Sequence, residues 1–211
     1  SGEPVSLPFH HMVITGITRL SGKTTTLEAL LTRADKTSLA FITKRGEHLL
    51  QGSPRLQPFF QERSDWQFVT LLLEATLRER LRMERSTIIR VTKNTSSLAD
   101  VKAKVDEDLE DPKIRGFNRD MLTNLGAYLD IVLPQLEAAP LTQTLALSEG
   151  VPQVMDLSGY AGEVQVLIIR SVVEEIYNKH YNVILVLPEA HKTIPQGYGT
   201  PAKPVIQRLI R

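Results

Sequence analysis

The sequence predicts an α/β fold in which a parallel sheet carries helices on both faces and a helical insertion separates two groups of strands. Three observations support this prediction. An apolar run at 12–16 leads through a glycine loop into a helical segment, and a second strand pattern follows at 37–43. A continuous apolar run at 182–187 is typical of a strand that is buried on both faces. Between these regions, apolar residues at helical spacing dominate residues 64–139.

The composition excludes several classes of protein. The chain has 211 residues, of which 42% are hydrophobic, so it can bury a sizeable core. The net charge of +1 provides no global field that draws nucleic acid or a membrane surface. Cysteine is absent, which excludes disulfides and thiolate chemistry, and no apolar run approaches the roughly 18 residues of a membrane span. We therefore expect a soluble cytoplasmic protein without a membrane partner.

The region around Gly22 has the order of a phosphate-binding loop. A β-branched apolar run ends at Gly16, a flexible loop follows, and Lys23 and Thr24 open a helix. Glycine lets backbone N–H groups surround a phosphate, and the helix N-terminus adds donors and a partial positive charge. In such loops the lysine reaches the β- and γ-phosphates and the hydroxyl binds Mg²⁺. The candidate nucleotide-binding residues are Gly16, Thr18, Ser21, Gly22, Lys23, Thr24 and Thr25.

The loop differs from the usual pattern in length. Five residues instead of four separate Gly16 from Gly22, and Arg19 and Leu20 stand where small residues are usual. The alternative is a chance Gly-Lys-Thr in an ordinary turn. The strand pattern before the loop and the helical pattern after it favour the phosphate-binding interpretation.

The segments after this loop predict a βαβ unit followed by the insertion. Strand 37–43 runs into Lys44 and Arg45, which either contact phosphate or DNA or lie in a solvated turn. A helix is expected to begin after Ser64 or Asp65, whose side chains are suitable caps. The other elements expected in the insertion are a strand at 86–91 and helices at 98–109 and 118–136. Either a solvated face or a DNA contact would explain the arginines at 78, 80, 82 and 85.

Asp156 marks a second candidate position for chemistry. We expect strands at 141–147 and 151–156, and then a helix at 163–179. Ligands of open α/β sheets lie at the carboxyl ends of strands, so Asp156 is a candidate Mg²⁺ ligand. A turn residue or a helix N-cap is an equally good interpretation of this aspartate.

The strand at 182–187 ends in an acid, as a Walker B strand does. Glu189 is the candidate residue that activates the attacking water, because nucleotide hydrolysis needs mainly positioning, Mg²⁺ and an oriented water. His191 either reports on the γ-phosphate or forms only a local hydrogen bond.

Four segments give the chain a resemblance to the HerA–FtsK superfamily, whose members are ring-forming, ATP-driven DNA translocases. These segments are 16–30, 154–167, 187–195 with Leu-Pro-Glu-Ala-His, and 200–211. The resemblance implies a RecA/ASCE-like P-loop NTPase fold, ATP and Mg²⁺ as cofactors, and catalytic roles for Lys23 and Glu189. It also implies a hexameric ring on double-stranded DNA, with a companion nuclease or a packaging role. Arg208 and Arg211 would act across subunits as arginine fingers, or would simply be helix-surface arginines.

The chain departs from this family pattern at two further places. Pro188 stands where the family usually has a metal-side acid, so that Thr24, water and Asp156 would have to suffice. Family members continue past the position of Arg211 with another strand, so we expect residues 1–211 to be either an isolated ATPase core or a core that lacks its C-terminal part. Two other functions stay open: a non-catalytic nucleotide-binding assembly module, and a small-molecule P-loop kinase, for which no lid-like arginine segment is evident.

Overall fold

A four-stranded, all-parallel sheet forms the centre of the α/β part of the molecule. The computed structural model describes residues 22–78, 80, 85–187 and 189–210. Gly16, Thr18, Ser21 and Arg211 therefore lie outside the described residues. The strand order is β2-β3-β1-β4. The strands are β1 (Ser38–Ile42), β2 (Arg55–Leu56), β3 (Pro152–Asp156) and β4 (Ile184–Val186).

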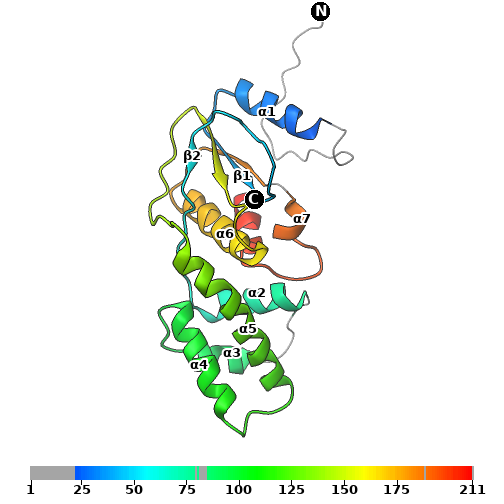
Figure 1. Ribbon diagram of the computed structural model, residues 1–211, viewed down its shortest axis with the longest axis vertical. Helices are drawn as coiled ribbons and strands as arrows, with labels where there is room; N and C mark the ends of the chain where they lie inside the picture. The colour runs from blue at the N-terminus through cyan, green and yellow to red at the C-terminus, as the bar shows by residue number, and fades with distance from the viewer. Residues whose placement is uncertain (1–21, 79, 81–84, 188, 211) are drawn as a thin grey trace, which may run out of the picture.

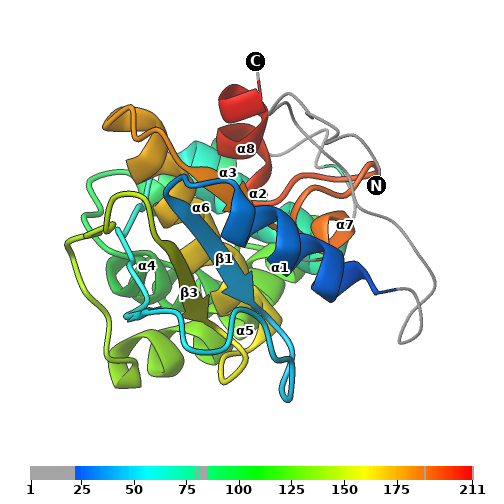
Figure 2. The ribbon, with the colours of Figure 1, turned by 90° about the horizontal axis from the view of Figure 1, so that it is seen from above.

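Helices cover both faces of this sheet, as the sequence predicts. On one face, α1 (Lys23–Arg33) packs Leu31 against Ala40 and Ile42 of β1. The alternate residues of β1, Leu39 and Phe41, point to the other face and join the larger core around α6 (Gly162–Asn178). Figure 2 shows β1 between α1 and α6. The short α7 (Ala190–Thr193) follows β4, and α8 (Lys203–Ile210) packs on α6.

The predicted insertion forms a helical lobe below the sheet in Figure 1. Its elements are α2 (Trp66–Leu77), α3 (Arg85–Thr92), α4 (Leu98–Glu110) and α5 (Phe117–Ala138). Of the two cap candidates for α2, Asp65 is the cap, because its carboxylate accepts a hydrogen bond from the Phe68 N–H at 3.1 Å. The lobe shares its apolar core with α6, so the lobe and the sheet are built around one continuous hydrophobic cluster.

Two predicted strands are wrong. Residues 86–91 form part of α3, because Ile88 and Val91 are buried at helical spacing in the lobe, and this packing outweighs the strand preference of a β-branched run. Residues 141–147 contain only an isolated bridge from Thr142 to Phe59.

The strand predicted at 182–187 is present but shorter and less buried. β4 covers only Ile184–Val186, and all three residues are half-buried. Within the described part of the chain, β4 pairs with β1. Ile184 and Val186 pack against the cluster around Leu31 and Leu185 packs against the larger core, so both faces of β4 are covered, but only in part. No helix among the described residues is both long and apolar enough to cross a membrane.

Candidate functional site

The first turn of α1 has the backbone conformation of an anion-binding helix start. Gly22, the N-cap, has φ 64° and ψ 18°, which is the left-handed region that favours glycine. The Thr26 N–H donates to the Gly22 carbonyl at 2.8 Å and closes the first helical turn. Glycine has no side chain to cap the helix, and the first turn holds no acidic residue. Within the described residues, the first turn of α1 therefore contributes no carboxylate of its own to the positive end of the helix dipole.

The start of α1 lies toward the carboxyl edge of the sheet. The helix and β1 run in opposite directions and are joined by a short connection at 34–37, as Figure 2 shows. All strands are parallel, so β1, β3 and β4 end at the same edge. This edge is where ligands bind in open α/β sheets. Lys23 is half-buried there, while Thr24 and Thr25 are exposed.

The carboxylate of Glu189 lies in contact with the ammonium group of Lys44. The distance from Lys44 Nζ to Glu189 Oε1 is 2.7 Å, and the two side chains are 51% and 32% exposed. The register of the strands explains this contact: Ala40 pairs with Val186, so the residues that follow β1 and β4 also lie side by side. His191 Nε2 lies 3.6 Å from the other oxygen, Glu189 Oε2, and the His191 side chain is largely exposed.

The backbone of Glu189 is in an unfavourable conformation for a residue with a side chain. It has φ 51° and ψ 43°, and it serves as the N-cap of α7. A non-glycine residue in the left-handed region costs about 1–2 kcal/mol. Among the described residues, five other non-glycine residues share this conformation, so it does not by itself mark a functional site: Asp35, Leu50, Arg78, Asn94 and His180. Glu189 follows β4, the strand that the sequence predicts to be a Walker B strand.

Asp156 lies at the same edge but has a visible local role. Its carboxylate accepts the Ser158 N–H at 2.9 Å, which makes it a turn residue. The N-cap of α6 is Ala161, so the alternative that Asp156 caps this helix is wrong. The strand pairing places Asp156 opposite Ile42, the last residue of β1. Asp156 is exposed and is therefore accessible to a ligand.

The oxygen donors at this edge fit Mg²⁺ better than a softer metal. Mg²⁺ in nucleotide sites uses one or two protein oxygens together with phosphate and water. A hydroxyl from Thr24 and a carboxylate from Asp156 are donors of this hard type. Among the residues that the structure describes, no three histidine, aspartate or glutamate side chains gather as a metal centre of their own.

Arg208 is placed away from these groups. It lies in the last turn of α8 and lines a cavity of about 300 Å³ between α2, α6 and α8. Trp66, Pro201 and Arg170 are among the other lining residues, whereas Lys23, Thr24, Asp156 and Glu189 are not.

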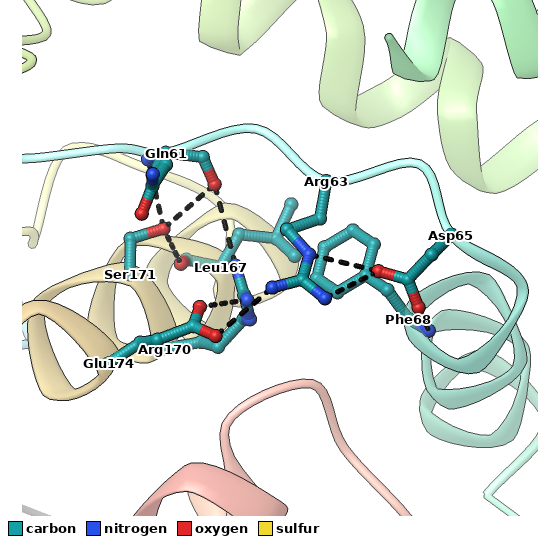
Figure 3. Close-up of polar contacts among 8 residues, drawn as sticks. All are labelled: Gln61, Arg63, Asp65, Phe68, Leu167, Arg170, Ser171 and Glu174. Atoms are coloured by element: carbon teal, nitrogen blue, oxygen red, sulfur yellow. Dashed lines mark hydrogen bonds and ion pairs between the residues drawn. The ribbon is translucent and has the colours of Figure 1, made fainter. Parts of the chain in front are cut away.

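A buried arginine that the sequence analysis missed joins the helical lobe to the sheet domain (Figure 3). Arg170 of α6 is 4% exposed, forms an ion pair with Glu174, and lies 4.9 Å above the Phe68 ring. Its guanidinium also donates to the Gln61 carbonyl at 3.4 Å. Burial lowers the pKa of Arg170, although the neighbouring Glu174 carboxylate opposes this shift. The sequence does contain a sign of this buried residue, because Arg170 is a charged residue within an otherwise apolar stretch of α6.

Arg63 completes this network from the loop before α2. It contacts Asp65 at 2.8 Å and Glu174 at 3.2 Å. Burial alone would raise the pKa of Asp65, but the Phe68 N–H and Arg63 hydrogen bonds outweigh it and lower that pKa. The network thus links the cap of α2 to the middle of α6, two elements from different layers. The two arginines and the two carboxylates compensate one another's charge.

Comparison with known proteins adds no relative to these observations. No protein-family model matches the chain, and no curated protein matches it.

Proposed function

We propose that the chain is an ATP-hydrolysing P-loop motor of the RecA/ASCE-like type. More specifically, we propose a HerA-like translocase that moves along double-stranded DNA as a ring, with six copies as the expected number. ATP and Mg²⁺ are the proposed cofactors, and a nuclease is the proposed companion.

The observation that carries this proposal is the start of α1. A left-handed glycine followed by Lys23 and Thr24, at the carboxyl edge of a parallel sheet, supports phosphate binding. Lys23 would hold the β- and γ-phosphates, and Thr24 and Asp156 would complete the Mg²⁺ site. Bound Mg²⁺ would neutralise charge that develops on the phosphate oxygens.

Glu189 would serve the hydrolysis step. It would accept the proton of a water whose oxygen attacks the γ-phosphorus, while the bond to the β–γ bridging oxygen breaks and ADP leaves. Its place after β4, at the edge where α1 begins, supports this role.

The DNA and ring parts of the proposal depend on the resemblance to the HerA–FtsK superfamily. The net charge of +1 gives no general attraction to DNA. A ring can build a positive channel from a few basic residues of each subunit, and the arginines near the end of α2 are candidates. Arg208 and Arg211 remain proposed as arginine fingers that reach a neighbouring subunit, as the resemblance implies.

ATP hydrolysis with and without duplex DNA, at several salt concentrations, tests this proposal. We expect turnover that duplex DNA stimulates, with a stimulation that declines as salt rises, because phosphate contacts release counterions. Lys23→Ala and Glu189→Gln should both abolish turnover. Hydrolysis that ignores DNA but responds to a metabolite would instead support a small-molecule kinase.

One observation favours a second candidate, a nucleotide-binding assembly module that does not hydrolyse ATP. The carboxylate of Glu189 is held by Lys44 and would have to be released before it could orient water. Absence of turnover in the assembled protein, together with tight ATP binding, would support this second function.

A further inference from the structure

The ion pair between Lys44 and Glu189 has a second consequence, which depends on the proposed function. We propose that Lys44 is a γ-phosphate-binding residue that also positions Glu189. Its ammonium group pairs with the Glu189 carboxylate until ATP binds, and it then pairs with the γ-phosphate instead. ADP, which has no γ-phosphate, leaves the pair intact.

Distance supports this exchange. A glutamate that orients the attacking water lies one water molecule away from the γ-phosphate, which is about 6 Å for two hydrogen bonds in series. Lys44 Nζ already lies 2.7 Å from that carboxylate. The lysine side chain has a flexible stem of four methylene groups, so a change of rotamer can move its ammonium group away from Glu189 toward a phosphate at that separation.

The solvent exposure of Lys44 and Glu189 also supports the proposed exchange of ion-pair partner. The side chains of Lys44 and Glu189 are 51% and 32% exposed, so the pair is solvated and easily exchanged. A buried pair of the Arg170–Glu174 kind would resist such an exchange, because removing one partner leaves an uncompensated charge. The γ-phosphate also carries more negative charge than a carboxylate and has three acceptor oxygens. The ammonium group of Lys44 is therefore expected to prefer the γ-phosphate to the Glu189 carboxylate.

The order of the strands explains why Lys44 lies next to Glu189. β1 lies directly beside β4, so the residue after β1 meets the residue after β4 at the carboxyl edge. The chain continues from β1 to Lys44 through Thr43 alone, which leaves little freedom for the backbone at this point. Arg45, the next residue, is exposed and provides a control of the same charge.

Equilibrium binding of ADP and of a non-hydrolysable ATP analogue to the full 211-residue chain, both with Mg²⁺, tests the proposal. Lys44→Met should weaken analogue binding about tenfold and leave ADP binding unchanged, and Lys44→Arg should restore most of the loss. Arg45→Met should bind both nucleotides as the wild-type protein does. Glu189→Gln should strengthen analogue binding, because Lys44 is then free to bind the phosphate, and this gain should shrink in the Lys44→Met background.

The possible failures of this experiment are distinguishable. If Lys23→Ala loses both nucleotides but Lys44→Met changes neither affinity, or changes both equally, the role of Lys44 is refuted while nucleotide binding stands. An equal gain from Glu189→Gln with and without Lys44 would also refute it. If the wild-type chain binds neither nucleotide, the proposed function and the role of Lys44 fail together.

Discussion

Replacement of Arg170 by methionine is the sharpest test of how the helical lobe is attached. Methionine has a similar length, so the variant removes the charge with little loss of volume. The side chain of Arg170 is 5% exposed, and the variant loses its ion pair with Glu174, its donation to the Gln61 carbonyl and its contact with the Phe68 ring. Breaking a buried ion pair from one side costs about 3–5 kcal/mol.

Arg63 reduces this cost. It lies 3.2 Å from Glu174 and continues to compensate part of the carboxylate charge. We therefore expect a loss near the lower limit, about 3 kcal/mol, which corresponds to a fall of about 6–12 °C in Tm for a chain of this size. Urea unfolding followed by circular dichroism, together with thermal unfolding, measures both quantities.

Arg63→Met is the matched control. Its side chain is 45% exposed, so its pairs with Asp65 and Glu174 are solvated and the variant should lose no more than about 1 kcal/mol. The double variant Arg170→Met/Glu174→Leu should recover most of the stability, because no buried charge is then left alone. If Arg170→Met destabilises the protein no more than Arg63→Met does, the network does not stabilise the attachment of the helical lobe to α6.

Two further predictions concern the helix starts. Gly22→Ala should destabilise the protein by about 1–2 kcal/mol, because alanine at φ 64° adopts the left-handed region at a cost, and thermal unfolding measures this loss. A Cβ at Gly22 would meet no atom within 4 Å, so a stability loss without a change in packing is expected. Asp100 in the capping box of α4 has a pKa lowered to about 2 by hydrogen bonds from Ser96 and Ser97. A lowered carboxyl pKa gives stability that is present above the unfolded value of 3.8 and is lost as pH falls toward 2. Urea titrations between pH 5 and 2 should therefore show a steeper loss in the wild-type protein than in Asp100→Asn, and equal slopes would contradict the assignment.

Periodicity in the sequence was sufficient for the elements whose burial follows one simple pattern. The predicted helix at 118–136 corresponds to α5, and the predicted strand at 151–156 corresponds to β3. Residues 86–91 were misassigned because Thr87, Ile88, Ile89 and Val91 are β-branched, and only the packing of the lobe decides that they form a helix. The position of β4 beside β1 was equally inaccessible, since it depends on the strand order.

In the candidate site, too, local patterns predict single residues, whereas contacts between distant residues depend on the strand order. Local motifs in the sequence predict roles for Gly22, Lys23 and Glu189, and they leave the role of Lys44 open between phosphate contact and solvated turn. The ion pair from Lys44 to Glu189 follows from the adjacency of β1 and β4, which are separated by more than 140 residues in the chain. Contacts of this kind require the strand order, and periodicity does not provide it.

Equilibrium binding of Mg·ATP to the wild-type chain and to Lys23→Ala, with Lys113→Ala as a control on the exposed surface of the lobe, tests the central claim most directly. Lys23, at the start of α1, is proposed to hold the β- and γ-phosphates. We expect the wild-type chain and Lys113→Ala to bind with equal affinity, and Lys23→Ala to lose binding by at least a hundredfold. Equal binding by all three proteins would contradict the account.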